Sequence, residues 1–187
     1  MPSRLPADVR RKLEPIGLVV LDVDGVLTDG GLIYSAAGED TKRFSARDGL
    51  AIRLLLRAGI HIAVISGRSS EAVRTRCLEL GMRDDLVVVG SSDKSADLDR
   101  LLETLQLSDS EFAAIGDDLP DLPLLARAAF AACPSDAAPE VIAISDLVCG
   151  AEGGRGAVRE FAEVLLKAQA RWTDLVSEWV GPGAQHG

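Results

Sequence analysis

The stretch that decides the fold of this chain is GLVVLDVDGVLTDG, at residues 17–30. Its first part, GLVVL, is an uninterrupted apolar run of strand length, which is typical of a strand that is buried on both faces of a sheet. Two aspartates follow at once, Asp22 and Asp24, and then Gly25. Because sites in parallel sheets lie beyond the carboxyl ends of the strands, we expect these aspartates to lie in a functional site.

Further apolar runs of strand length follow this one and alternate with segments of helical periodicity. The expected strands are 60–65, 86–89, 112–115 and 129–132, and the expected helices between them are 50–58, 71–80, 96–105 and 119–128. This alternation predicts an α/β fold with a doubly wound, Rossmann-like parallel sheet.

Two segments depart from the alternation. Residues 30–46, GGLIYSAAGEDTKRFSA, predict a small β-hairpin that turns near residues 36–38, which is a flap and not a cap domain. After the glycine-rich CGAEGGRGA (149–157), apolar residues three and four apart predict one long helix that packs on its own sheet or on a neighbouring subunit: Val158, Phe161, Leu165, Ala168, Trp172, Leu175 and Trp179. We expect one domain over 1–187, with its core at about 16–166 and its C-terminal helix and tail at about 156–187.

Composition excludes several classes of protein. The net charge of −9 and the lack of a lysine and arginine cluster argue against a nucleic-acid partner, and no apolar run is long enough to cross a bilayer. The polar start, MPSRLPADVRRKLEP, predicts no secretory signal. Three cysteines without metal spacing predict reduced thiols in a cytoplasmic protein. With only His61 and His186 available, histidine-based catalysis is not expected.

The two aspartates of DVDG suit phosphoryl transfer. Residues two apart in an extended chain face the same way, so Asp22 and Asp24 can point into one site. One carboxylate can attack phosphorus while the other protonates the leaving oxygen and later deprotonates water. By itself, the motif fits an Asp-Gly turn at the end of a buried strand equally well.

Three other expected strands also end in polar residues. Ser66-Gly67-Arg68 can bind a phosphate oxygen or cap a helix, and Lys94 can balance negative charge or lie in solvent. The carboxylates of Asp117, Asp118 and Asp121 repel one another unless a cation such as Mg²⁺ lies among them; helix capping explains only one of the three.

In this order, DxDG, SGR, a lysine and GDDxxD, the motifs resemble those of the haloacid dehalogenase superfamily, across about residues 22–121. The resemblance implies that Asp22 is the nucleophile and Asp24 the acid/base, and that Ser66, Gly67 and Lys94 bind phosphate. It also implies that Mg²⁺ is held by the following groups: Asp22, the backbone carbonyl of Asp24, and Asp117, with Asp118 or Asp121 assisting.

Three longer stretches, DVDGVLTDGGLIYSAAGEDTKRFSARDG, ISGRSS…VRTRC and GGRGAVRE, are similar to the capless phosphatases that act on 3-deoxy-D-manno-octulosonate 8-phosphate, across about residues 18–166. That resemblance implies a role in lipopolysaccharide precursor synthesis, a homotetramer whose flaps border neighbouring sites, and a C-terminal segment that can close over a site. The implied contacts to the sugar acid are the Arg47-Asp48-Gly49 segment, Arg68, Arg76 and Arg155. One departure is Val89, where family members commonly have Gln.

Two alternatives stay open. A phosphatase for another phosphosugar, such as a nine-carbon sialic-type acid, would have the same motifs, although such enzymes tend to have Glu at positions 68 and 155, where this chain has Arg. A receiver domain also uses a phosphorylated aspartate, but it places its acid pair after the first strand and has no second acid two residues beyond the nucleophile. Nucleotide-binding and EF-hand motifs are absent from the sequence.

Overall fold

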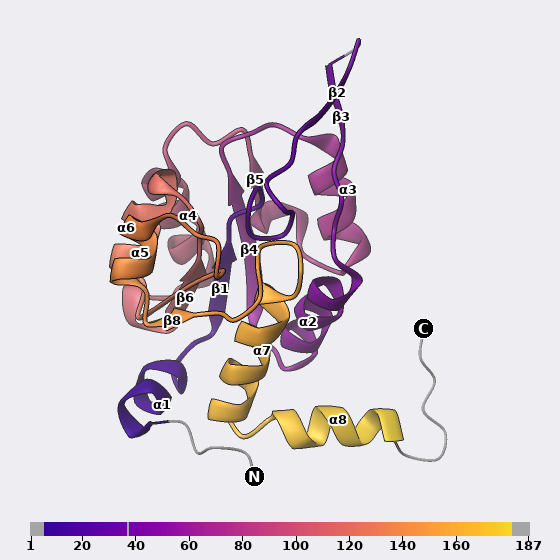
Figure 1. The fold of residues 1–187 in the computed structure, drawn as a ribbon. Coiled ribbons are helices and arrows are strands. Elements are labelled where there is room, and N and C mark those ends of the chain that lie inside the picture. The colour runs from indigo at the N-terminus through magenta and orange to yellow at the C-terminus, as the bar shows by residue number, and fades with distance from the viewer. Residues whose placement is uncertain (1–5, 37, 181–187) are drawn as a thin grey trace.

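The fold is a six-stranded parallel sheet with helices on both faces, in a computed structural model that describes residues 6–36 and 38–180 (Figure 1). The strands lie in the order β5-β4-β1-β6-β7-β8, with a separate two-stranded hairpin β2-β3. The strands are β1 Leu18–Leu21, β2 Ile33–Ser35, β3 Gly38–Thr41, β4 His61–Ser66, β5 Val87–Val89, β6 Phe112–Ile115, β7 Phe130–Cys133 and β8 Leu147–Val148. The helices are α1 Ala7–Leu13, α2 Ala46–Arg57, α3 Glu71–Glu79, α4 Lys94–Leu105, α5 Leu122–Arg127, α6 Pro139–Ile144, α7 Ala157–Ala168 and α8 Trp172–Val180.

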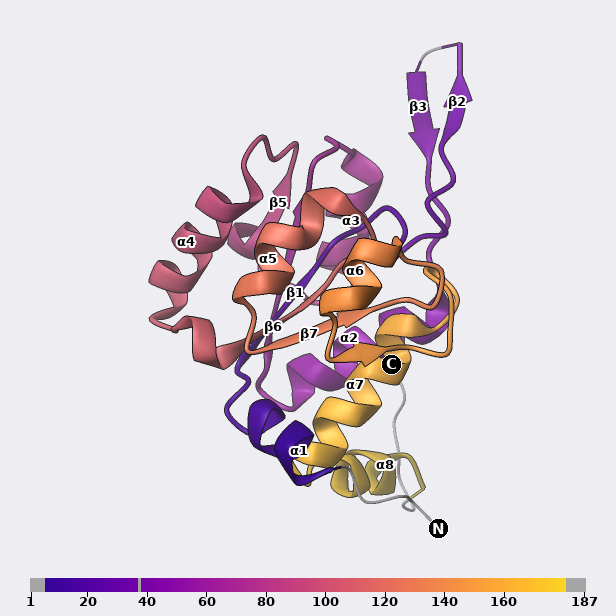
Figure 2. The ribbon, with the colours of Figure 1, turned by 60° about the vertical axis from the view of Figure 1, so that its left-hand side comes forward.

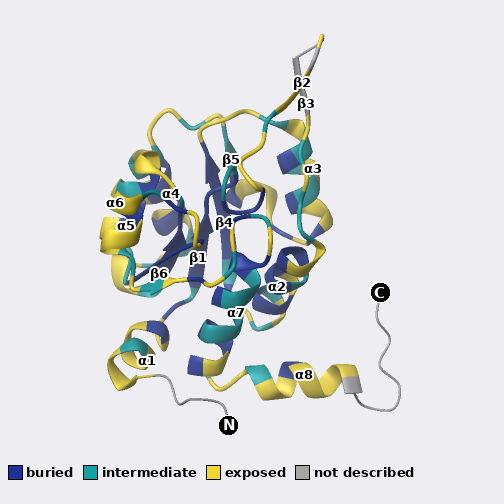
Figure 3. Ribbon diagram, in the orientation of Figure 1, coloured by how far each residue is buried: buried dark blue, intermediate teal, exposed yellow. Residues whose placement is uncertain are grey.

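The central strands are buried on both faces, as their uninterrupted apolar sequence requires (Figure 3). In β1, Val19 and Leu21 belong to a core that they share with α2, α3 and α7. Leu18 and Val20 belong to a second core, on the other face, that they share with α4, α5 and α6. Because successive side chains of a strand point to opposite faces of the sheet, β1 contributes to both cores. This confirms the predicted doubly wound arrangement.

The chain reverses its direction of winding across the sheet beside β1. It first adds β4 and β5 on one side of β1, and then returns to add β6, β7 and β8 on the other. In an open α/β sheet, ligands bind at the carboxyl ends of the strands where the winding reverses, which here is the crevice between β1 and β6. Asp22 follows β1 and Asp117 follows β6 within two residues, so both motifs flank this crevice.

The hairpin β2-β3 projects away from the body of the molecule (Figures 1 and 2). Its strands pair antiparallel, with Ser35 opposite Gly38 and an irregularity between Ile33 and Tyr34. Both of these apolar residues are exposed. The predicted flap is therefore confirmed, and the described residues contain no separate cap domain.

The predicted C-terminal helix is wrong in one respect, because the structure breaks it into α7 and α8. Ala170 adopts a left-handed backbone with φ 57°, and the amide of Arg171 donates to the carbonyl of Leu166 at 2.8 Å, which closes the last turn as a Schellman motif does. The apolar side of α7 packs on α2 and on the core of the same chain. The apolar periodicity continued across the break, so periodicity alone could not reveal the turn.

Three short elements were absent from the sequence prediction: α1, α6 and β8. The strand β8 has only two residues at the edge of the sheet, and α6 has six, so neither produces a clear periodic pattern. In the described part of the chain, no helix is long and apolar enough to cross a membrane. Cys77, Cys133 and Cys149 are buried free thiols, as the sequence predicted.

Asp48, in the first turn of α2, anchors the start of α7. Gly156 precedes that helix and has no side chain to cap it, and the buried carboxylate of Asp48 accepts from the amides of Gly156 at 3.1 Å and Arg159 at 2.8 Å. A carboxylate at a helix N-terminus satisfies unpaired amides and interacts favourably with the helix dipole. Burial nevertheless raises the pKa of Asp48, against the lowering effect of these amides. Its side chain thus holds the start of α7.

We expect Asp48→Ala to lower the free energy of unfolding by about 2–4 kcal/mol, because two buried amides would lose their acceptor. Asp48→Asn should fall between the wild type and the alanine variant, since an amide keeps one acceptor oxygen and carries no buried charge. Urea denaturation of the three proteins measures the order. An alanine variant as stable as the wild type would contradict this role for Asp48.

Candidate active site

The polar residues that follow four strands meet in one cavity of about 270 Å³. Asp22 follows β1, Ser66 ends β4, Lys94 opens the helix after β5, and Asp117 follows β6. Parallel strands bring their carboxyl ends to the same edge of the sheet, which is why residues far apart in sequence lie together. The lining residues are Asp22, Asp24, Ser66, Gly67, Arg68, Lys94, Asp117, Asp118, Pro120 and Asp121.

Lys94 links the predicted nucleophile to a second carboxylate. Its ammonium nitrogen lies 2.5 Å from Oδ1 of Asp22 and 2.6 Å from Oδ1 of Asp121. Burial raises the pKa of Asp22 to about 7, with repulsion from Asp121 adding to the rise and attraction to Lys94 opposing it. Burial lowers the pKa of Lys94, but the two carboxylates outweigh that effect and raise it. Lys94 is therefore a charged group held between two acids.

Asp117 lies in the same group of carboxylates. Burial, followed by repulsion from Asp22 and Asp121, raises the pKa of Asp117 to about 7. Oxygens of Asp22, Asp117 and Asp121 lie within 4.8 Å of one another. Mg²⁺ prefers carboxylate oxygens, and carboxylates packed this closely need a cation to offset their repulsion. These residues therefore fit a magnesium ion.

The structure separates the two acids that were left as alternatives beside Asp117. Asp121 is buried, and its Oδ2 accepts from the amide of Asp117 at 3.0 Å. Asp118 is exposed, and its Oδ1 accepts from the amide of Leu119 at 2.8 Å, which caps the 3-10 turn Leu119–Asp121. Asp121 thus belongs to the carboxylate group. Asp118 also lines the cavity, but its carboxylate caps the 3-10 turn.

Glycines allow the segments around the site to approach closely. A Cβ on Gly25, whose φ is 92°, would lie 2.0 Å from a carboxylate oxygen of Asp117, and a Cβ on Gly116 would lie 2.4 Å from the Cβ of Asp121. Behind this loop, a Cβ on Gly153 would lie 1.8 Å from the carbonyl oxygen of Gly25. The glycine-rich segment after β8 therefore supports the DVDG loop, a role that its composition alone did not reveal.

Ser66 and Gly67 lie where the sequence predicted a phosphate to bind. The side chain of Ser66 is almost fully buried at the end of β4, and its Oγ accepts from the amide of Arg68 at 3.3 Å. The turn is fixed to the next strand end, because the amide of Gly90 donates to the carbonyl of Arg68 at 3.1 Å and that of Ser91 donates to the carbonyl of Ser66 at 2.9 Å. Ser66 and Gly67 both line the cavity.

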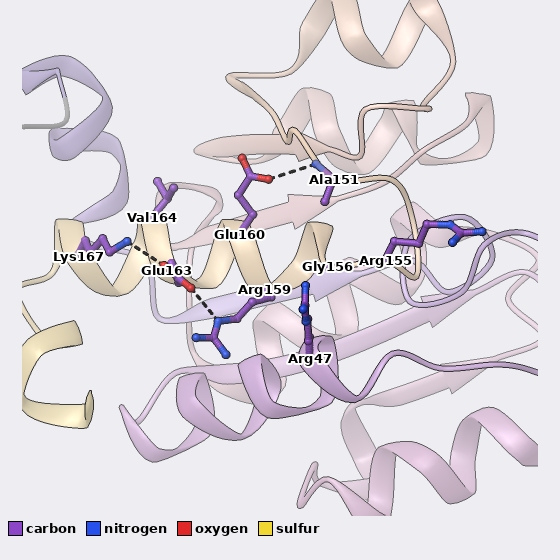
Figure 4. A pocket seen from close by; sticks show the side chains of 9 residues that line it. All are labelled: Arg47, Ala151, Arg155, Gly156, Arg159, Glu160, Glu163, Val164 and Lys167. Atoms are coloured by element: carbon purple, nitrogen blue, oxygen red, sulfur yellow. Dashed lines mark hydrogen bonds and ion pairs between the residues drawn. The ribbon is translucent and has the colours of Figure 1, made fainter. Parts of the chain in front are cut away.

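Of the four predicted substrate arginines, all in the described part of the chain, Arg68 alone lines this cavity. Arg47 and Arg155 line a second cavity of about 270 Å³ along α7 (Figure 4). Arg76 lines a third cavity, between α2 and α3, where a Cβ on Gly49 would lie 2.5 Å from its guanidinium. The four predicted arginines therefore do not all meet in one cavity of the chain.

Lys42, just after β3, is a site residue that sequence reasoning missed. Its nitrogen lies 2.5 Å from Oδ1 of Asp24, and its side chain is only 1% exposed. The other oxygen of that carboxylate, Oδ2, lies 3.6 Å from Nε of Arg68. In the sequence, Lys42 stands in the polar run EDTKR of the flap and looks like a solvated surface residue. Only the path of the chain after the hairpin brings it to Asp24.

Comparisons with known proteins agree with this geometry. A family model described as haloacid dehalogenase-like hydrolase matches residues 38–129. The 3-deoxy-D-manno-octulosonate 8-phosphate phosphatase KdsC of Escherichia coli K12 is 41% identical over 165 residues, which are 88% of this chain and 87% of that protein. The match thus extends over nearly the whole length of both proteins.

Solved structures give the same result. The phosphatase of that name from Moraxella catarrhalis, in complex with magnesium, phosphate and KDO, is 38% identical with a TM-score of 0.88, and the match covers 92% of this chain and 98% of that one. The Yersinia pestis phosphatase is 37% identical with a TM-score of 0.86, over 89% of each chain. The chain therefore belongs to the 3-deoxy-D-manno-octulosonate 8-phosphate phosphatase family of haloacid dehalogenase-like hydrolases.

Proposed function

We propose that this protein is a Mg²⁺-dependent phosphoric monoester hydrolase that converts 3-deoxy-D-manno-octulosonate 8-phosphate to the free sugar acid and phosphate, a step in lipopolysaccharide precursor synthesis. The observation that carries the proposal is the single cavity in which Asp22, Asp24, Ser66, Lys94 and Asp117 meet. Membership of the phosphatase family supports the substrate.

In the proposed first step, a carboxylate oxygen of Asp22 attacks phosphorus. The bond from Asp22 to phosphorus forms while the bond from phosphorus to the ester oxygen breaks, and Asp24 gives that oxygen its proton. Lys94, 2.5 Å from Asp22, offsets the negative charge of the nucleophile and of the approaching phosphate. Ser66 and Gly67 hold phosphate oxygens through a hydroxyl and a backbone amide.

In the proposed second step, water hydrolyses the aspartyl-phosphate. Asp24, now a carboxylate, takes a proton from the water as its oxygen attacks phosphorus, and the bond from phosphorus to Asp22 breaks. Asp22 is returned as a carboxylate, Asp24 is protonated again, and phosphate leaves. The second acid two residues beyond the nucleophile is what allows repeated turnover, because a protein without it would keep its phosphoryl group.

The metal ligands that we propose are Asp22, the backbone carbonyl of Asp24, and Asp117, with Asp121 beside them. When bound there, Mg²⁺ would neutralise charge on the nucleophile and on the phosphate oxygens. Asp121 assists by accepting from the amide of Asp117 at 3.0 Å and by holding Lys94 at 2.6 Å, which orients both of these groups toward Asp22.

The sugar acid carries a carboxylate at the end opposite to its phosphate, so a selective site needs cations beyond those at the phosphate. We propose that Arg68 supplies one of them within the subunit, and that Arg47, Arg76 and Arg155 act across a subunit boundary. Their placement in other cavities supports this, since in one subunit they lie away from the cavity of Asp22.

We accordingly propose a homotetramer of single-domain subunits spanning residues 1–187, in which each projecting hairpin borders a neighbouring site. The exposed Ile33 and Tyr34 on the hairpin give it an apolar surface that suits such a contact (Figure 1). We also propose a cytoplasmic location, with which three buried free thiols are consistent.

We expect phosphate release to be fastest for 3-deoxy-D-manno-octulosonate 8-phosphate in a panel of phosphorylated sugar acids and simple sugar phosphates, assayed with Mg²⁺. Asp22→Asn should abolish turnover, because an amide cannot form the acyl phosphate. If no ester in the panel is hydrolysed, the proposed activity is wrong. If simple sugar phosphates are hydrolysed as well as the sugar acids, only the assigned substrate is wrong.

Removal of Mg²⁺ by a chelator should abolish activity, and added Mg²⁺ should restore it. The wild-type melting temperature should rise with Mg²⁺, because a ligand that binds only the folded state stabilises it. Asp117→Ala should lose both responses. Asp99→Ala, which removes an exposed carboxylate paired with Arg127, is the matched control and should keep them. Full activity after exhaustive chelation would exclude the metal.

Sedimentation velocity at micromolar concentration should show a tetramer. Tyr34→Asp places a charge on the exposed part of the hairpin and should shift the distribution toward smaller species, because a charge in an apolar interface is costly to desolvate. Thr104→Asp, on the exposed surface of α4, is the matched control. A wild-type protein that sediments only as a monomer would rule out the proposed assembly.

A further inference from the structure

The salt bridge between Lys42 and Asp24 connects the hairpin to the active site. Lys42 stands one residue after β3, and its ammonium nitrogen lies 2.5 Å from Oδ1 of Asp24. The Lys42 side chain is 1% exposed, whereas that of Asp24 is 20% exposed. A lysine buried so deeply is rare unless it is paired, so this contact is a built feature of the fold.

Lys42 acts on the reaction through Asp24. It is absent from the residues that line the cavity, which do include Asp24 itself. Because its nitrogen holds Oδ1, the other oxygen of that carboxylate is directed toward Arg68, whose Nε lies 3.6 Å from Oδ2 and which lines the cavity. The two cations therefore hold different oxygens of the Asp24 carboxylate.

The hairpin and the residue that follows it contact both Asp24 and Arg68. Lys42 follows its second strand, and Tyr34 in its first strand accepts at its hydroxyl from NH1 of Arg68 at 3.5 Å. A movement of the hairpin would therefore act on Asp24 directly through Lys42, and indirectly through Arg68. The flap is thus a part of the site and not only a wall beside it.

We propose that Lys42 is a positioning residue that holds Asp24 for proton transfer, so that the placement of the hairpin controls the acid/base step. This inference rests on the proposed phosphatase activity. Asp24 must place one oxygen beside the ester oxygen in the first step and beside the attacking water in the second. A free aspartate side chain populates several rotamers, and a misplacement of about 1 Å can cost on the order of 100-fold in rate.

The first step allows a selective test, because its need for a proton depends on the ester. A sugar phosphate releases an alkoxide, which requires protonation by Asp24 as the bond breaks. 4-Nitrophenyl phosphate releases a stable phenolate, which does not. Since kcat/KM reports the steps up to the first irreversible one, loss of a well-placed acid should lower kcat/KM for the sugar ester far more than for the aryl ester.

We expect Lys42→Met to lower kcat/KM for the sugar ester by about 10- to 100-fold, while kcat/KM for 4-nitrophenyl phosphate changes little. Lys42→Arg should recover much of the loss, because it restores a cation beside Asp24. Arg43→Met, at the neighbouring position, removes an exposed cation that pairs with Asp29 outside the cavity, and this matched control should behave as the wild type on both esters.

The stability of the Lys42 variants distinguishes a positioning role of this residue from a purely structural one. Removing one partner of an ion pair is costly when the other charge is left buried and unpaired, but Asp24 is 20% exposed to water and also faces Arg68. The melting temperature of Lys42→Met should thus stay near that of the wild type. If this variant does not fold, Lys42→Gln, which keeps a polar group at the same place, takes its position in the comparison.

A double-mutant cycle completes the test. In an Asp24→Asn background, Lys42→Met should lower kcat/KM for the sugar ester by much less than in the wild type, because the acid that it positions is already gone. Equal losses on both esters, no loss on either, or equal losses in both backgrounds would overturn the role of Lys42 and leave the phosphatase intact. A wild type that hydrolyses neither ester would overturn the proposed function, and this inference with it.

Discussion

Repulsion among carboxylates at the carboxyl ends of β1 and β6 is the constraint on which the rest of the site depends. Asp22, Asp117 and Asp121 offer oxygens within 4.8 Å of one another, and burial together with repulsion raises the pKa of Asp22 and of Asp117 to about 7. Such a group is stable only with positive charge among it. Lys94 supplies one such charge from the start of α4, and the remaining negative charge makes the group suitable for Mg²⁺.

Close backbone packing keeps these carboxylates together. Gly25 lets the two strand-end loops touch at a distance that any Cβ would prevent, Gly116 lets the second of these loops fold closely on its own Asp121, and Gly153 brings a third loop against the first from behind. The third loop leads into α7, whose first amides are held by Asp48 from α2. The site is thus connected through α7 and α2 to the core on one face of the sheet, so its geometry depends on packing well outside the cavity.

The hairpin contributes to the site in a different way, which follows from the small size of this domain. A flap of this size cannot enclose a substrate as a separate cap domain does, and the hairpin β2-β3 projects from the body (Figure 2). Within the chain, however, Lys42 just after β3 contacts Asp24, and Tyr34 in β2 contacts Arg68. In the proposed assembly the hairpin would border a neighbouring subunit, while these two contacts stay within the site of its own chain. This arrangement would let assembly and the acid/base step influence each other.

The sequence by itself determined the parallel sheet, the flap and the residues at four strand ends, because apolar runs, helical periodicity and polar residues after strands are local signals. Only the tertiary structure decided which distant groups pair. Lys42 pairs with Asp24, and Asp48 accepts from the amides of Gly156 and Arg159. Asp121, rather than Asp118, belongs to the carboxylate group. The tertiary structure also placed Arg47, Arg76 and Arg155 outside the cavity of Asp22. Pairing of charges depends on distance in space and on burial, and neither is encoded in the local pattern of the chain.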